Sequence, residues 1–182
     1  SGSLRRDSHN TRLLRAAAEL LPDGVELELW AGLAQVPPYD EDDDGPGAPA
    51  GAVQARTAVA GADALLLATP EYNSSIPGQL KNGVDWASRP LGENALWGKP
   101  TAVVGASAGM FGAVWAQAEM RKTVAAAGAR IVDKDLPVGK ADQAFTDDGR
   151  LNDQELRERY TEILDELVSL AEQTGQPQEV AA

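Results

Sequence analysis

Small hydroxyl, amide and glycine residues recur in three polar turns, and these turns hold the side chains best suited to binding a ligand. The first turn contains Ser3, Arg5, Ser8 and Asn10 and leads into an amphipathic helical pattern. Hydroxyls and backbone N–H groups at the start of a helix, with an arginine beside them, form a site for a phosphate group. Ordinary capping of that helix by Ser8 or Asn10 is the alternative interpretation.

The second turn follows a short apolar run and contains one flat aromatic side chain. Residues 62–68 (ADALLLA) show no polar alternation, which is typical of a parallel strand buried on both faces. Pro70 ends this run, and Glu71, Tyr72 and Asn73 follow it in a polar loop. Open α/β sheets bind ligands at the carboxyl ends of their strands. The loop is therefore predicted to border the ring system of a ligand.

The third turn, residues 105–112, is rich in glycine and has three interpretations. A dinucleotide-binding fingerprint is excluded, because Ser107 stands where the middle glycine of G-x-G-x-x-G is required. Gly105, Ser107 and Gly109 spell the G-x-S-x-G of a nucleophile elbow, which makes a serine hydrolase one alternative. Its only available base, His9, precedes the serine, whereas that fold places the histidine last. In the third interpretation, Ser107 and the backbone around Gly109 line a flat cofactor.

The elements that must position these turns alternate between strands and helices. Apolar runs at 62–68, 100–106 and 129–132 predict buried strands, and the alternating segment 25–30 predicts an edge strand. Helical patterns separate them, with apolar residues spaced along 13–21, 52–60, 80–87, 114–124 and 156–170. The alternation predicts an α/β fold, a doubly wound parallel sheet with helices on both faces in three αβα layers.

In such a sheet the three turns would converge on one crevice, a pattern that favours a phosphorylated flat ligand. Flavin mononucleotide (FMN) is favoured over a nucleoside triphosphate, because the sequence has no G-x-x-x-x-G-K-[ST] segment. A sheet of the flavodoxin type also places a strand immediately before its phosphate turn. No apolar run precedes Gly2, so this first strand is expected to be missing from the sequence.

The composition excludes several classes of protein. Among 182 residues, 28 are acidic and 16 are basic, which gives a formal net charge of −12. A strongly acidic surface repels nucleic acid and anionic lipid, so neither is expected as a partner. The absence of cysteine rules out disulfides, thiolate metal sites and a cysteine nucleophile. With no apolar run long enough for a membrane span and no signal-peptide pattern, a cytoplasmic protein is expected.

The length and pattern favour one domain. Residues 1–173 are predicted to form it, and residues 174–182 are predicted to be a frayed C-terminal tail. An aspartate-rich loop at residues 40–45 resembles the start of a calcium-binding loop, but Gly51 stands where the bidentate glutamate is required. No metal site is therefore predicted.

Together these motifs resemble the NAD(P)H-dependent FMN reductase family, which includes bacterial quinone, chromate and azo-dye reductases with a flavodoxin-like fold. The resemblance runs from residue 2 to about residue 130 and is carried by GSLRRDSHN, PPYDED, PEYNSSIPGQLKNGVDWASRP and GASAGMFG. It implies that the first turn holds the FMN phosphate, through Ser3, Arg5, Ser8, Asn10 and Thr11. It also implies that the isoalloxazine ring is bordered by Pro70, Glu71, Tyr72, Asn73, Ser107 and Gly109.

The function implied by this resemblance is hydride transfer from NADH or NADPH, through bound FMN, to a quinone or another small acceptor such as chromate, an azo dye or free flavin. The cofactor carries the chemistry, so no catalytic acid or base is expected from the protein. A non-enzymatic electron carrier like flavodoxin is the alternative. Family members form dimers or tetramers, so a homodimer or homotetramer is expected, with Trp86 and Arg89 as interface residues. Tyr72 is predicted to shape the acceptor site.

Overall fold

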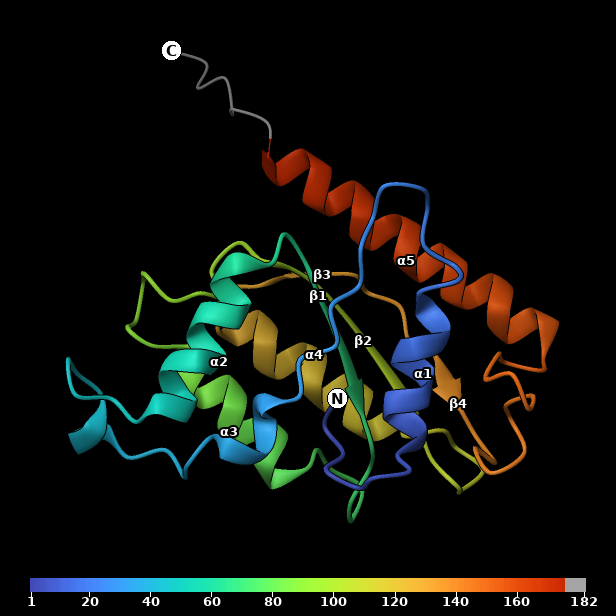
Figure 1. Ribbon diagram of the computed structural model, residues 1–182, viewed down its shortest axis with the longest axis horizontal. Helices are drawn as coiled ribbons and strands as arrows, with labels where there is room; N and C mark the ends of the chain where they lie inside the picture. The colour runs from blue at the N-terminus through green and yellow to red at the C-terminus, as the bar shows by residue number, and fades with distance from the viewer. Residues whose placement is uncertain (176–182) are drawn as a thin grey trace.

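A central parallel sheet lies between two groups of helices in a computed structural model that describes residues 1–175 (Figure 1). The strands are β1 (Leu65–Thr69), β2 (Pro100–Ala106), β3 (Arg130–Ile131) and β4 (Pro137–Val138). The α-helices are α1 (His9–Ala17), α2 (Ala50–Gly61), α3 (Gly78–Ala87), α4 (Val114–Ala126) and α5 (Gln154–Gly175). Two short 3-10 helices, η1 (Gly32–Gln35) and η2 (Glu41–Asp43), lie between α1 and α2.

β2 is the centre of the sheet because it pairs along both of its edges. β1 pairs with one edge in parallel, from Leu65 opposite Thr101 to Thr69 opposite Gly105. On the other edge β3 pairs with the start of β2 and β4 pairs with its end, both in parallel. All these strands direct their carboxyl ends to one edge of the sheet, which is where open α/β sheets bind ligands.

Helices cover both faces of the sheet, and successive residues of β2 point to opposite sides. Val104 packs in one cluster with Leu13 of α1 and Ile163 of α5. Val103 packs on the opposite face in a second cluster with Met120 of α4. This alternation is the two-residue period of a strand whose faces are both buried. The three αβα layers confirm the predicted flavodoxin-like, doubly wound α/β fold.

The predicted strands at 62–68, 100–106 and 129–132 are confirmed as β1, β2 and the short β3. The helical patterns are confirmed as α1 to α5. β4 was not predicted, because its two residues, Pro137 and Val138, lie in a polar segment that has no apolar run. Sequence patterns therefore found the elements that build the core and missed one of the two shortest pairings.

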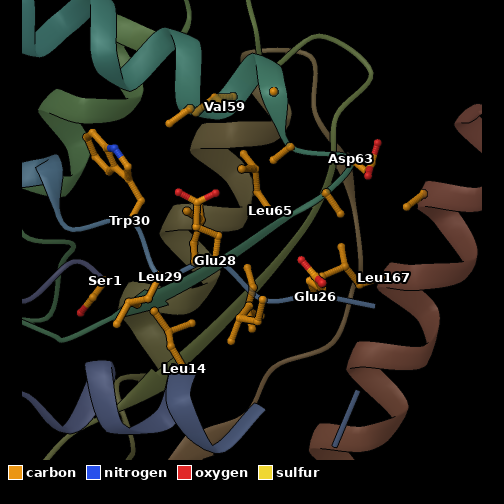
Figure 2. Close-up of a pocket in the computed structure, with 18 of the residues that line it drawn as sticks. Ser1, Leu14, Glu26, Glu28, Leu29, Trp30, Val59, Asp63, Leu65 and Leu167 are labelled. Carbon is orange, nitrogen blue, oxygen red and sulfur yellow. The ribbon is translucent and has the colours of Figure 1, made fainter. Parts of the chain in front are cut away.

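The predicted edge strand at 25–30 is wrong, because within the described chain these residues pair with no strand. A cavity of about 1060 Å³ is bounded by this segment on one side and by residues 64–67 on the other (Figure 2). Ladder hydrogen bonds require neighbouring strands to lie roughly 4.8 Å apart, and a space of this size keeps the two segments from that approach. Leu27 and Leu29 instead pack against the cluster beneath α1 and α5.

The ends of the described chain bear on two predictions. α5 continues to Gly175, two residues into the predicted tail, and residues 176–182 lie outside the described residues. Residues 1–8 form no strand, but the Gly2 N–H donates to the Ala68 carbonyl over 2.8 Å at the end of β1. A Cβ at Gly2 would lie 2.6 Å from Leu80 Cδ2, so a larger residue here would require the Leu80 side chain to shift.

Candidate functional site

The three predicted ligand turns lie at the carboxyl edge of the sheet. Residues 2–8 precede α1, residues 70–75 follow β1 and residues 107–113 follow β2. β1 and β2 are neighbouring parallel strands, so the loops that follow them are neighbours as well. The hydrogen bond from Gly2 to Ala68 brings the first turn to the same place.

Asn10 fixes the first turn against the end of β2. Its Nδ2 donates to the Ala106 carbonyl, and its Oδ1 accepts from the Ala106 N–H, each over 2.9 Å. Both residues are buried, so this two-point contact satisfies polar groups that water does not reach. The contact gives Asn10 a positioning role, since it holds the start of α1 at the sheet edge.

The start of α1 is suited to an anion. Ser8 is the N-cap, and its Oγ accepts from the Thr11 N–H over 3.2 Å. The first turn of the helix contains no acidic side chain, and the positive end of the helix dipole lies there. Arg5 is exposed beside it and donates to the Asp7 carbonyl over 2.5 Å, while Ser3 is half-buried. This set of hydroxyl, guanidinium and N–H donors fits a phosphate group although the whole chain is acidic.

Tyr72 is the first residue of a tight hairpin turn. Tyr72 and Ser75 exchange backbone hydrogen bonds of 3.0 and 3.1 Å. Asn73 and Ser74, between them, have φ values of 53° and 59°, which is the pattern of a type I′ turn. Pro70 is buried at the base of the loop. The tyrosine ring is 53% exposed and offers a flat surface for stacking.

The turn after β2 is held by backbone contacts with the segment that follows β4. The Ser107 N–H donates to the Val138 carbonyl and the Ser107 carbonyl accepts from the Ala141 N–H, each over 3.0 Å. The Gly109 carbonyl accepts from the Lys140 N–H over 2.9 Å. Within the turn, Ser107 Oγ accepts from the Gly109 N–H over 3.0 Å. Ser107 and Gly109 therefore form a fixed wall of the site.

The side chains around Ser107 do not support the serine hydrolase alternative. A serine nucleophile needs a base within hydrogen-bond reach. The chain's one histidine, His9, instead has its Nε2 3.0 Å from Asp142 Oδ1. Across residues 1–175 no hydrogen bond joins Ser107 to His9. The glycine-rich turn is thus not arranged as a nucleophile elbow.

Three large apolar side chains beside the third turn were missed by sequence reasoning. Met110, Phe111 and Trp115 are all exposed at the junction of this turn with α4. Phe111 and Trp115 pack edge to face with their ring centroids 5.1 Å apart. The signal was available, because bulky apolar residues inside a glycine-rich turn have no helical or strand period to explain them.

The cavity beside β1 does not suit a phosphorylated ligand. Leu14, Leu65 and Leu167 line it together with the carboxylates of Glu26 and Glu28 (Figure 2). Its described lining includes four acidic residues but no lysine, arginine or histidine. A phosphate placed there would meet charges of its own sign with no compensating cationic side chain among the described lining residues. The turns at the carboxyl edge, and not this cavity, form the candidate site.

The predicted interface position at Trp86 is wrong, because its side chain is fully buried within the chain. The Trp86 indole Nε1 donates to the Pro37 carbonyl over 2.9 Å, and Arg56 Nε donates to the Trp86 carbonyl over 2.8 Å. Arg89 Nε donates to the Tyr39 hydroxyl over 3.0 Å. Both predicted interface side chains hold down the loop that follows η1, which the helical spacing alone did not reveal.

The aspartate-rich loop near residue 40 is tied up by local contacts. Asp44 forms a 2.5 Å ion pair with Arg56, and Asp40 accepts from the Asp42 N–H over 3.0 Å. Among residues 1–175, no group of three or more His, Asp or Glu side chains is arranged to hold a metal ion. No helix in this described range is both long and apolar enough to cross a membrane.

The structure defines a flavodoxin-like α/β protein with three polar turns at one edge of its sheet. The same fold is found in the flavoenzyme NAD(P)H:acceptor oxidoreductase FerB from Paracoccus denitrificans. The two structures superpose with a TM-score of 0.80 at 33% sequence identity, over 96% of each chain.

The chain belongs to the NADPH-dependent FMN reductase family, whose profile matches residues 1–143. It is 43% identical over 168 residues to an NAD(P)H-dependent FMN reductase of Pseudomonas aeruginosa, covering 92% of this chain and 90% of that protein. It is 38% identical over 160 residues to a quinone reductase of Pseudomonas putida, covering 84% and 82%. The predicted resemblance is confirmed, and with it the class of enzyme, an oxidoreductase that uses FMN and a reduced nicotinamide.

Proposed function

We propose that this chain is an FMN-dependent NAD(P)H oxidoreductase whose electron acceptor is a quinone. The observation that carries the proposal is the convergence of an anion-suited helix start and an exposed tyrosine turn at one edge of the sheet. Relatives named quinone reductase support this class of acceptor. Chromate, azo dyes and free flavin are further proposed acceptors, because an open stacking surface selects weakly among flat or small oxidants.

The proposed FMN site uses the three turns at the carboxyl edge of the sheet. Its phosphate end lies at the start of α1 and its ring end lies between the other two turns. The proposed contact residues are Ser3, Arg5, Ser8, Asn10, Thr11, Pro70, Glu71, Tyr72, Asn73, Ser107 and Gly109. The chemistry that bound FMN supplies is two-electron transfer between the nicotinamide and the acceptor. The protein groups bind and orient, and none is required to donate or accept a proton.

The assembly and the location of the protein are also proposed. A homodimer or homotetramer is supported by exposed large apolar side chains such as Trp97 and Phe111. A net charge of −12 supports the absence of nucleic-acid and membrane-surface partners, and we propose a cytoplasmic location. Sedimentation velocity of the FMN-loaded protein tests the assembly, and a single monomeric species would overturn it.

The test of the function is an absorption spectrum of the purified protein, before and after addition of FMN and then of NADPH without oxygen. Bound flavin absorbance that bleaches with NADPH and returns on addition of a quinone supports the proposed reaction. Folded protein that binds no FMN would refute it.

The same preparation separates the enzyme from a non-enzymatic electron carrier. An enzyme oxidises NADPH continuously when a quinone is supplied, whereas a carrier depends on a separate reductase. Steady-state oxidation of NADPH by the purified chain alone therefore decides between the two.

A further inference from the structure

The helix that follows the glycine-rich turn begins without a cap of its own. Ala113, at the N-cap position of α4, has φ 61° and ψ 30° and makes no side-chain hydrogen bond. The first N–H groups of a helix need acceptors from elsewhere. Here Glu71 Oε2 accepts from the N–H groups of Trp115 and Ala116, each over 3.1 Å. A residue from the loop after β1 thus caps a helix that starts more than forty positions later.

α4 returns a carboxylate to the same loop. Glu119 Oε2 accepts from Ser75 Oγ over 2.7 Å and lies 3.4 Å from the Ile76 nitrogen, which donates to it. Glu119 lies one helical turn beyond Trp115, so both contacts fall along the first two turns of α4. Glu71 precedes the hairpin turn and Ser75 closes it, and Tyr72 lies between them as the first residue of the turn. The loop is therefore fastened to α4 on both sides of the tyrosine.

We propose that Glu71 and Glu119 are positioning residues that together hold the Tyr72 turn against α4 and so set the ring-bordering wall of the FMN site. This assignment rests on the proposed function for the identity of the ligand. The family resemblance placed Glu71 at the isoalloxazine ring, whereas the structure commits its carboxylate to the N-terminus of α4. There the helix dipole stabilises the negative charge.

The attachment of the Tyr72 turn to α4 affects how the site binds its ligand. The turn is fixed by bonds to a helix that is packed in the core, since Ala116 and Met120 of α4 are fully buried. A wall built in this way does not need the ligand to order it, which reduces the entropy cost of binding. The two carboxylates therefore contribute to FMN affinity without touching FMN themselves, and the proposed contact of Glu71 with FMN is made by its backbone.

The first test is amide hydrogen exchange in the FMN-free protein, compared among wild type, Glu71→Ala and Glu71→Gln. We expect Glu71→Ala to raise exchange about tenfold at Trp115 and Ala116, and by a similar factor at Tyr72 and Ser75 across the loop. Glu71→Gln keeps a carbonyl acceptor and should recover part of the protection. Faster exchange at the start of α4 alone would mean a simple helix cap and would overturn the proposal.

The second test is FMN affinity, measured by quenching of flavin fluorescence on titration of the apo-protein. Glu71→Ala and Glu119→Ala should each weaken FMN binding about five- to tenfold, and Ser75→Ala by less, because it removes only one of the bonds. Glu93→Gln also removes one negative charge, but at an exposed position. It is the matched control and should leave FMN affinity unchanged.

The outcomes separate the two proposals. If wild type binds no FMN but Glu71→Ala still loosens both α4 and the turn, the proposed function fails and the positioning role stands as a structural one. If wild type binds FMN and the variants change neither exchange at Tyr72 nor affinity, the positioning role is overturned and the function stands.

Discussion

At the scale of single residues, the site depends on polar side chains that bond to the protein rather than to a ligand. Asn10 joins the start of α1 to the last residue of β2, and Glu71 joins the loop after β1 to α4. Both sit among residues that the sequence marks as ligand contacts. Buried or half-buried polar groups are costly to leave unpaired, so each of these links constrains where its turn can lie.

Replacing Asn10 with alanine should lower the free energy of unfolding by about 2–4 kcal/mol, because the two hydrogen bonds to the buried Ala106 backbone are lost. Urea denaturation followed by circular dichroism measures the change. Asn10→Asp keeps the acceptor but loses the donor and should recover little. Thr11→Ala is the control, and its half-buried hydroxyl should cost less than about 1 kcal/mol. An Asn10→Ala variant as stable as wild type would contradict this account.

Replacing Tyr72 with alanine should raise the KM for a quinone about 2- to 12-fold, which corresponds to the loss of about 0.5–1.5 kcal/mol of aromatic contact. Tyr72 is exposed at the start of its turn, so stability should change little. Tyr72→Phe keeps the stacking surface and should retain most of the wild-type KM. Steady-state kinetics with a benzoquinone check the prediction, and equal KM values in all three proteins would rule out a stacking role.

At the scale of elements, the turn after β2 needs two close backbone approaches. Gly112 has φ 57°, and a Cβ there would lie 2.2 Å from the carbonyl carbon of Pro137. A Cβ at Gly139 would lie 2.3 Å from the Met110 carbonyl oxygen. These contacts join the glycine-rich turn to β4. Glycine here is required by the packing of one loop on another as well as by its backbone angle.

Gly112→Ala should therefore destabilise the protein by about 3 kcal/mol or more, since it adds a left-handed backbone strain to a backbone clash. For a chain of this size, that lowers Tm by about 6–12 °C. Differential scanning calorimetry gives the shift. Gly61→Ala, at the end of α2 with nothing within 4 Å of its Cβ, is the matched control and should shift Tm by no more than about 3 °C. Equal shifts in the two variants would show that the loop contact is dispensable.

At the scale of the whole molecule, one sheet separates two apolar clusters. Val104 belongs to the cluster beneath α1 and α5, and Val103 to the cluster beneath α3 and α4. Both side chains are fully buried. Because β2 contributes to both clusters and pairs on both edges, loss of either cluster removes support from the same strand. The three layers are therefore expected to unfold as one cooperative unit.

Val103→Ala and Val104→Ala should each lower the free energy of unfolding by about 1.5–3 kcal/mol. The two cavities open on opposite faces, so the double variant should lose the sum to within about 0.5 kcal/mol. All three variants should keep a single unfolding transition in urea. Two separate transitions in either single variant would show that one layer unfolds without the other.

The sequence by itself determined the class of fold and the three turns that build the site. Continuous apolar runs located β1 and β2, helical periodicity located α1 to α5, and glycine and proline marked the turns between them. These features are local, because the burial of a strand on both faces and the spacing of a helix are written in neighbouring residues. The motifs in the same turns were also enough to indicate the family.

Only the tertiary structure decided what the side chains of those turns do. The bonds of Asn10 to Ala106, of Glu71 to α4 and of Trp86 to the loop at Pro37 join positions 30 or more residues apart. A period of two or of 3.6 residues carries no information about such pairs, and propensity gives way to packing when the two disagree. For that reason residues 25–30 were predicted as a strand and are not one, and the cap that the Glu71 carboxylate forms on α4 was not predicted.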